Sequence, residues 1–188
     1  MSLKEGLIAA QKAVALDDED AHAHAALSSL CLFAERHEQA ISECRRAVEL
    51  NPNFAEARAY LANALGLAGQ AEEALVELDT AMRLDPHYPP QYLMMLGRTH
   101  FVMGDYLAAI APLERSIAIS RGFTPSRTLL AACYWAAGRE DEAKSHVVEL
   151  LSENPILNQN YARAVTPFKD TKVRERFVDY LGKAGLPA

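Results

Sequence analysis

The sequence predicts an all-α fold in which antiparallel helix hairpins stack into an α-solenoid. Three observations lead to this prediction. The same residue type returns every 34 or 35 positions, as at Ala40, Ala74, Ala109 and Ala143. Each repeat contains two stretches with apolar residues at helical spacing. No stretch alternates apolar and polar residues with β-branched enrichment, so we expect no strands.

Residues 55–88 illustrate how one repeat is built. Apolar residues recur at helical spacing over 55–68 and again over 71–84. Gly69 separates the two stretches, and glycine readily takes the positive φ that ends a helix. Pro86 ends the second helix, because proline restricts the residue before it and lacks an N–H donor. Small residues such as Ala74 let neighbouring helices approach closely while leucines fill the gaps.

The repeat rhythm also predicts the domain organisation. Residues 1–20 match only the second helix of a truncated repeat, which suggests that the natural protein continues upstream. Four full repeats are expected, with one extra residue between the second and the third, over residues 21–54, 55–88, 90–123 and 124–157. Residues 158–188 are expected to form C-terminal capping helices. Asp170 is a suitable N-cap for the last of these, and Gly185 is suited to end it.

Several motifs resemble one known family. The segment 55–65, with Gly69-Gln70, Glu73-Ala74 and Leu84-Asp85-Pro86, resembles the tetratricopeptide repeat (TPR) consensus, and the similarity covers about residues 4–157. The resemblance implies a right-handed superhelix of hairpins. The sequence departs from the family pattern in ways that suggest local differences in packing, at Glu35, Arg58, Ser116, Arg121 and Leu150.

The tail of the chain resembles a more particular group. Pro167-Phe168-Lys169-Asp170 and the residues up to Pro187 resemble the end of bacterial proteins in which a TPR array follows a class III adenylate/guanylate cyclase domain. This resemblance implies that the array could be a regulatory or dimerisation region of a larger signalling enzyme. The catalytic domain of such an enzyme would lie upstream.

Composition and motifs exclude several classes of function. The formal net charge is −6, and no run of Lys and Arg would suit a nucleic-acid backbone. No apolar stretch reaches the length of a membrane span, so we expect a cytoplasmic protein. The three cysteines and six histidines are scattered, which predicts neither a metal site nor a cofactor. No GxSxG, P-loop or HExxH motif is present, and we expect no enzyme activity from this chain alone.

The TPR resemblance implies that the first helices of successive repeats line a concave groove for a protein or peptide partner. The residues expected to line it are His22, Ser29, Phe33, Glu56, Asn63, Leu67, Gln91, Met94, Arg98, Phe101, Val102, Thr128 and Trp135. Exposed aromatic and Met side chains there would serve as anchors for a peptide or helix.

Two alternatives stay open at this point. Phe101 and Trp135 could instead pack between repeats or beneath the C-terminal helices. The groove could receive a separate partner, or an upstream domain or second copy of the same protein. Capture of a terminal carboxylate is not expected, because the positions of the required clamp hold Ala25, Ser29, Tyr60, Gln91 and Met95.

Overall fold

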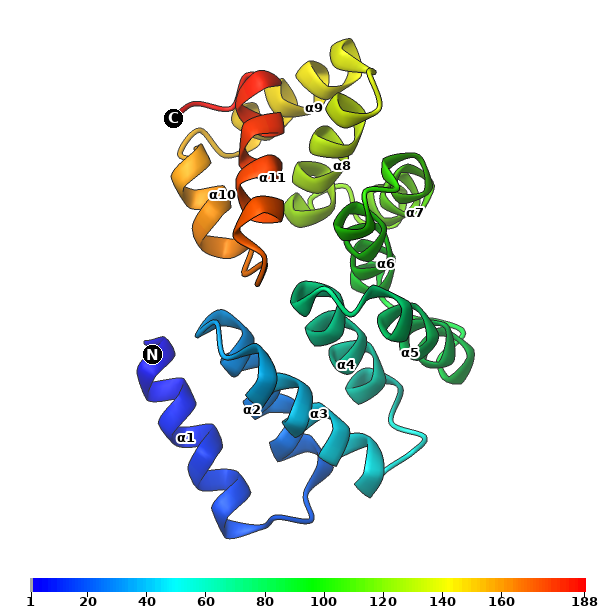
Figure 1. Cartoon of the computed structure of the whole chain (residues 1–188), viewed down its shortest axis with the longest axis vertical. Helices are drawn as coiled ribbons and strands as arrows, with labels where there is room; N and C mark the ends of the chain where they lie inside the picture. Colours follow the sequence, from blue (N-terminus) through cyan, green and yellow to red (C-terminus); the bar gives the residue numbers. More distant parts are fainter. Residues whose placement is uncertain (1) are drawn as a thin grey trace. The chain divides into compact units, whose positions relative to one another are not determined.

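The computed structural model describes residues 2–188, and the regular structure in that part of the chain is entirely helical (Figure 1). The prediction of an all-α fold without strands is confirmed. The contacts of the chain divide it into two compact units, one ending at Tyr88 and the other beginning at Pro89. We describe them separately as unit 1 and unit 2.

Unit 1 consists of one helix followed by two hairpins. Its helices are α1 (Leu3–Leu16), α2 (Ala21–Phe33), α3 (His37–Leu50), α4 (Ala55–Ala68) and α5 (Ala71–Leu84). Helices α2 and α3 pair, as do α4 and α5, while α1 packs beside α2 and α3 packs beside α4. The stacking of α2, α3 and α4 is therefore continuous through the unit.

Small side chains allow the close stacking in unit 1. Ala47 of α3 is fully buried in a cluster with Ala21 and Ala25 of α2 and Ala57 of α4. Partly buried larger side chains, including Phe54, surround this cluster. An alanine at this contact removes the bulk that would separate the helix axes. The recurrence of alanine in the sequence thus has a direct packing cause.

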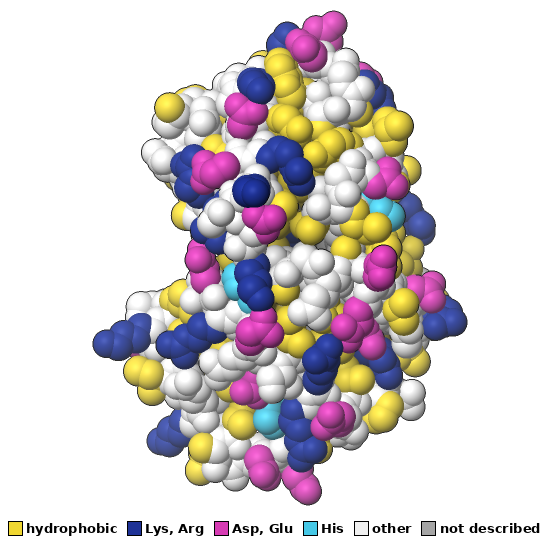
Figure 2. Space-filling view, viewed as in Figure 1, with side chains coloured by type: hydrophobic (Ala, Val, Ile, Leu, Met, Phe, Trp, Pro, Cys, Tyr) yellow, Lys and Arg dark blue, Asp and Glu magenta, His cyan; other side chains and the backbone are white. Residues whose placement is uncertain are grey.

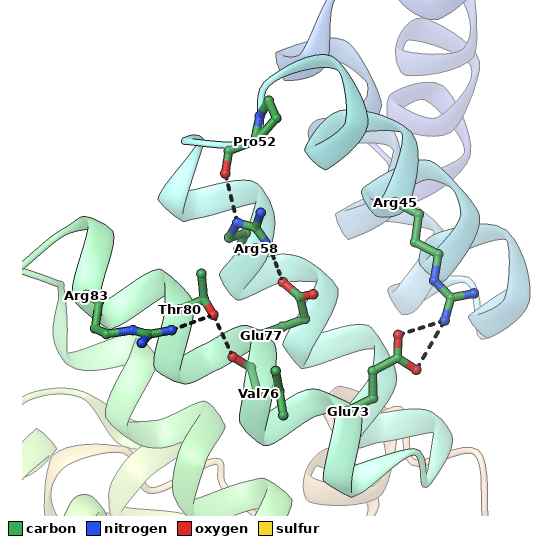
Figure 3. Close-up of polar contacts among 8 residues, drawn as sticks. All are labelled: Arg45, Pro52, Arg58, Glu73, Val76, Glu77, Thr80 and Arg83. Carbon is green, nitrogen blue, oxygen red and sulfur yellow. Dashed lines mark hydrogen bonds and ion pairs between the residues drawn. The ribbon is translucent and has the colours of Figure 1, made fainter.

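Ion pairs join the helices of unit 1 on their more polar sides (Figure 3). The Arg58 guanidinium of α4 donates to the Glu77 carboxylate of α5 at 2.7 Å and to the Pro52 carbonyl at 2.9 Å. Arg45 of α3 donates to Glu73 of α5 at 2.9 Å. The first pair is mostly buried and the second is about half exposed. Figure 3 shows both pairs reaching between helices.

The turn between the two helices of each full hairpin uses one residue in the left-handed region. Gly69, Gly104 and Gly138 have φ values of 89°, 81° and 78°. Glu35 occupies the corresponding position in the first hairpin with φ of 57°. Glycine tolerates this conformation, whereas a side chain with a Cβ is strained by it. Glutamate in place of glycine at position 35 therefore strains the backbone locally, and the turn still forms.

Unit 2 consists of two hairpins followed by two C-terminal helices. Its helices are α6 (Pro90–Met103), α7 (Tyr106–Ile119), α8 (Thr124–Ala136), α9 (Glu140–Glu153), α10 (Gln159–Val165) and α11 (Thr171–Lys183). Helix α11 packs against both α8 and α10. The Asp170 carboxylate accepts a hydrogen bond from the Lys172 amide, as expected of an N-cap.

Two residues of α10, Gln159 and Arg163, fix the C-terminal helices. The Gln159 side-chain amide donates to the Leu186 carbonyl at 2.9 Å, and its backbone amide donates to the Pro187 carbonyl at 2.8 Å. The Arg163 guanidinium of α10 forms two hydrogen bonds with the Glu175 carboxylate of α11. The end of the described chain is thereby tied back to α10.

Candidate interaction site

The predicted groove residues of unit 1 fall at three repeated positions on α2 and α4. We call this set the first-helix face of unit 1. Its members pair by repeat position, as His22 with Glu56, Ser29 with Asn63, and Phe33 with Leu67. Helices α2 and α4 contact each other directly, so the two halves of the face adjoin.

Exposure differs strongly among these residues. Phe33 is 59% exposed, which is unusual for a phenylalanine at the end of a packed helix. His22 and Glu56 are also exposed, while Ser29 and Asn63 are partly buried. Leu67 is buried, and the expectation that its side chain would be presented to a partner is wrong.

Aromatic and polar contacts orient two members of the face, His22 and Ser29. The His22 ring lies 4.5 Å from the Phe54 ring, measured between centroids, and its Nδ1 is 3.5 Å from Asp20 Oδ1. The Ser29 hydroxyl lies 3.3 Å from the Ala25 carbonyl, to which it donates. These contacts orient side chains that still reach solvent.

Tyr60, which the sequence interpretation named only at a position of the carboxylate clamp and not among the groove residues, also belongs to this neighbourhood. It is half-buried, and its hydroxyl donates to the Glu56 carboxylate. The pair lies one helical turn apart on α4, a spacing that brings side chains together. That spacing was the sequence signal that could have identified it.

The predicted groove residues of unit 2 lie on α6 and α8, and only part of the set is open. Gln91 is exposed. The half-buried members are Arg98, Val102, Thr128 and Trp135. Burial lowers the pKa of the Arg98 guanidinium to about 10, which leaves it charged at neutral pH. Met94 is buried, so its predicted role as an exposed anchor is wrong.

Phe101 is the clearest correction to the predicted site. Its side chain is 0% exposed and lies in an aromatic cluster with Phe168 and Phe177. The ring centroids are 6.0 Å from Phe168 and 5.8 Å from Phe177, the latter edge to face. The Arg176 guanidinium lies 5.8 Å from the Phe101 centroid. The C-terminal helices therefore cover Phe101, as the alternative interpretation allowed.

Trp135 is half-buried and packs against its own hairpin. The Lys144 ammonium of α9 lies 5.6 Å from the Trp135 ring centroid, within the range of a cation–π contact. Lys144 also pairs with Glu140 at 3.4 Å. Thr128, two turns earlier on α8, donates its hydroxyl to the Thr124 carbonyl at 2.9 Å.

The surface carries mixed charge. On the face drawn in Figure 2, acidic and basic side chains are interspersed, and neither sign forms a continuous patch. A protein that follows a phosphate backbone needs a basic stripe, which this face does not offer. Within residues 2–188, no three His, Cys, Asp or Glu side chains gather as they would around a metal ion.

The three cysteines do not form a reactive site. Cys31, Cys44 and Cys133 are buried and unpaired. Burial raises the pKa of the Cys44 thiol to about 12, and it raises that of Cys133 as well. Both side chains are therefore poor nucleophiles at neutral pH.

In the described part of the chain, no helix has the length and apolar character that crossing a bilayer requires.

The succession of hairpins with small residues at their contacts defines a helical repeat protein. The sequence profile of the tetratricopeptide repeat matches residues 34–98 and 102–165, which together form more than half of the chain. The chain belongs to the tetratricopeptide repeat family. A search of curated proteins gave no match.

Several solved structures share the fold. TTC0263, a thermophilic TPR protein of Thermus thermophilus, is 24% identical with a TM-score of 0.70, and the match covers 93% of this chain and 88% of that one. YrrB, a TPR protein with an unusual peptide-binding site, is 23% identical with a TM-score of 0.59, covering 94% and 90%. PilW, a type IV pilus biogenesis factor, is 19% identical with a TM-score of 0.74, covering 97% and 82%. At these identities the likeness concerns the fold.

Proposed function

We propose that this chain is a non-catalytic protein–protein interaction module that binds a peptide segment or helix on the surface formed by the first helices of its hairpins, chiefly on the first-helix face of unit 1. The exposed ring of Phe33 carries the proposal. It lies on α2, one helical turn from Ser29, whose repeat position on α4 holds Asn63; His22 and Glu56 occupy a further repeat position on the same two helices. An apolar anchor with polar neighbours is the usual anatomy of a binding surface.

Energetics favour Phe33 as the anchor. Burying a fully exposed phenylalanine side chain contributes about 1.5–3 kcal/mol, and Phe33 retains more than half of its possible exposure. The Glu56 carboxylate and the Ser29 hydroxyl can accept hydrogen bonds from a peptide backbone. The face therefore combines a hydrophobic contribution with groups that would orient an extended or helical segment.

The open residues of unit 2 form a second, smaller part of the proposal. Gln91, Arg98, Val102, Thr128 and Trp135 remain at least partly accessible on α6 and α8. Met94 and Phe101 are excluded from this role by their burial.

The fold class supports a role in interaction. YrrB, whose fold this chain shares, is a TPR protein with an unusual peptide-binding site. Function still has to be argued from the site, because one fold serves many functions. The exposed aromatic on the first-helix face is the argument that belongs to this chain itself.

Selection of peptides from a phage-displayed library tests the proposal. Peptides selected on the immobilised protein are then titrated against Phe33→Ala and, as control, Val76→Ala. Val76 is also exposed in unit 1, at 65%, but lies on the second helix α5. We expect at least a tenfold loss of affinity for Phe33→Ala, which corresponds to about 1.4 kcal/mol, and no change for Val76→Ala. Equal affinities for both variants would contradict the proposal.

A second candidate is a regulatory or dimerisation region of a larger signalling enzyme. It rests on the resemblance of residues 167–187 to the tails of bacterial cyclases with TPR arrays. Light scattering of the purified chain tests the dimerisation form of this proposal. A stable dimer at micromolar concentration would support it, and a monomer would count against it.

A further inference from the structure

The first-helix face of unit 1 carries carboxylates at one end and an exposed aromatic side chain at the other. Asp20 is the N-cap of α2, and Glu56 occupies the second position of α4. Phe33 is the last residue of α2 and follows His22 by eleven residues. Because α2 and α4 contact each other, both ends belong to one surface.

One aromatic contact brings the two carboxylates to the same end of the face. The His22 ring lies 4.5 Å from the Phe54 ring, measured between centroids, and Phe54 immediately precedes α4. His22 Nδ1 lies 3.5 Å from Asp20 Oδ1, and Glu56 follows Phe54 by two residues. The beginnings of α2 and α4 therefore adjoin, with an acidic residue on each.

The two helices supply little positive charge to balance these carboxylates. Helix α2 contains neither Lys nor Arg, and α4 contains only Arg58. The Arg58 guanidinium donates to the Glu77 carboxylate of α5 at 2.7 Å, so its charge is already paired. The hydrogen bond that Glu56 accepts comes from the Tyr60 hydroxyl, which brings no charge. This end of the face therefore stays negative and suits a basic side chain.

Polar side chains lie along the face between its two ends. Ser29 and Asn63 share one repeat position on α2 and α4, and Tyr60 comes three residues before Asn63. All three are partly buried. Hydroxyl and amide groups can donate hydrogen bonds to a peptide backbone and accept them from it. A helix satisfies its own backbone groups, whereas an extended segment needs partners for them. The middle of the face therefore favours an extended segment.

The length of α2 sets the spacing that a bound segment must match. His22 and Phe33 are eleven residues apart, which corresponds to about 16 Å along the axis of an α-helix. An extended chain rises about 3.3 Å per residue, so about five residues cover this distance. A helical segment lying along α2 would need about eleven residues, as α2 itself does.

We infer that the first-helix face of unit 1 binds an extended segment that carries Arg or Lys about five residues before or after a large apolar side chain. The basic side chain lies at the end with Asp20 and Glu56, and the apolar side chain packs on Phe33. The inference rests on the proposed function, because it names the chemistry of the segment bound at the same surface. The charges fix the orientation of the segment, and Phe33 anchors it.

The sequences of peptides selected on the immobilised chain provide the first test. The displayed peptides must be long enough to contain either spacing. We expect pairs of a basic and a large apolar residue about five positions apart to be enriched over the unselected library. Enrichment at about eleven positions would indicate a helical partner and would overturn the extended form of the inference.

Isosteric variants of the protein test the charge. Asp20→Asn keeps an N-cap for α2, and Glu56→Gln keeps an acceptor for the Tyr60 hydroxyl. In fluorescence anisotropy with a labelled selected peptide, we expect the double variant to bind at least tenfold more weakly than the native chain. Glu72→Gln is the matched control, because Glu72 is an exposed acidic residue on α5 of the same unit, and the affinity should not change.

A second peptide assigns the effect to the basic side chain. It has the sequence of the selected peptide with glutamine in place of its Arg or Lys. This peptide should bind the native chain and the double variant with equal affinity, because the interaction is absent from both complexes. Circular dichroism should show the same helical content in the native chain and in every variant.

Two results would overturn the inference, and they differ in what they imply for the proposed function. Peptides that lose affinity with Phe33→Ala but bind the double variant as tightly as the native chain would exclude the basic partner and leave the proposed function standing. Selected peptides that bind Phe33→Ala as tightly as the native chain would exclude both.

Discussion

Arg58 and Glu77 join the two helices of the α4/α5 hairpin through a mostly buried ion pair of 2.7 Å. The same two repeat positions pair His24 with Glu43 in the preceding hairpin, also at 2.7 Å. The sequence interpretation noted Arg58 only as a departure from the TPR pattern. The structure gives this departure a cause, because the guanidinium bridges α5 and the carbonyl of Pro52.

Replacing Glu77 by Gln should destabilise unit 1. The change leaves the Arg58 guanidinium mostly buried without its counter-charge, and a hydrogen bond to a charged group contributes about 1.5–3 kcal/mol. Chemical denaturation followed by circular dichroism measures the loss. Glu73→Gln is the control, because the Arg45–Glu73 pair is about half exposed and should contribute about 0–1 kcal/mol. Equal losses of unfolding free energy in the two variants would show that burial does not strengthen the Arg58–Glu77 pair.

Replacing Gly97 by Ala should destabilise unit 2. A Cβ at Gly97 would lie 2.5 Å from Cγ of Leu113, which is fully buried and cannot move aside freely. Overpacking of this kind costs about 1–3 kcal/mol. Gly122→Ala is the matched control, since a Cβ there meets nothing within 4 Å. An unchanged melting temperature of the Gly97→Ala variant would refute the close approach of α6 and α7.

Substitutions at two equivalent hairpin-turn positions, Glu35 and Gly69, should change the stability of the chain in opposite directions. Glu35 has φ of 57° and Gly69 has φ of 89°. A side chain with a Cβ is strained in this region by about 1–2 kcal/mol. We expect Glu35→Gly to stabilise the chain by up to about 1 kcal/mol and Gly69→Ala to destabilise it by about 1–2 kcal/mol. Effects of the same sign, measured by denaturation, would argue against the strain.

The Cys44 thiol should make stability depend on alkaline pH. Its pKa in the folded chain is raised by burial from 9.0 to about 12. The neutral thiol therefore favours the folded state, and this contribution is fully present below pH 9 and is lost as pH rises through about 12. Cys44→Ala should show a shallower fall in unfolding free energy over that range.

Alkylation provides an independent measurement of the same burial. Iodoacetamide at pH 8 should leave Cys44 unmodified in the native chain and modify it after denaturation, because the thiolate is the reactive form. Mass spectrometry reports the modified sites. Rapid native modification of Cys44 would contradict its buried environment.

Local regularities in the sequence were enough to predict the fold. Ala40, Ala74 and Ala109 recur at a regular spacing because each hairpin needs a small residue at this packing position. Such a repeat can be recognised from the sequence alone. The N-cap at Asp170 was predictable for the same reason, since its hydrogen bond to the Lys172 amide is formed within one turn.

The candidate site was less predictable, because it depends on contacts between distant segments. Phe101 has the spacing of an inward-facing residue on a first helix, yet Phe168 and Phe177 from the C-terminal region cover it. Helical periodicity tells which side of a helix a residue occupies, but not what later packs there. Phe33 and Leu67 share one repeat position and still differ, with the first exposed and the second buried.

The position of the chain's only tryptophan determines what optical experiments can detect. Trp135 lies in α8, so indole emission reports on the unit that begins at Pro89 and not on α1–α5. Far-ultraviolet dichroism reports on helices throughout the chain. Superimposable melting curves from the two signals would indicate one cooperative transition. Diverging curves would show that the halves melt independently, and a change such as Glu77→Gln would then be silent in fluorescence while shifting the dichroism.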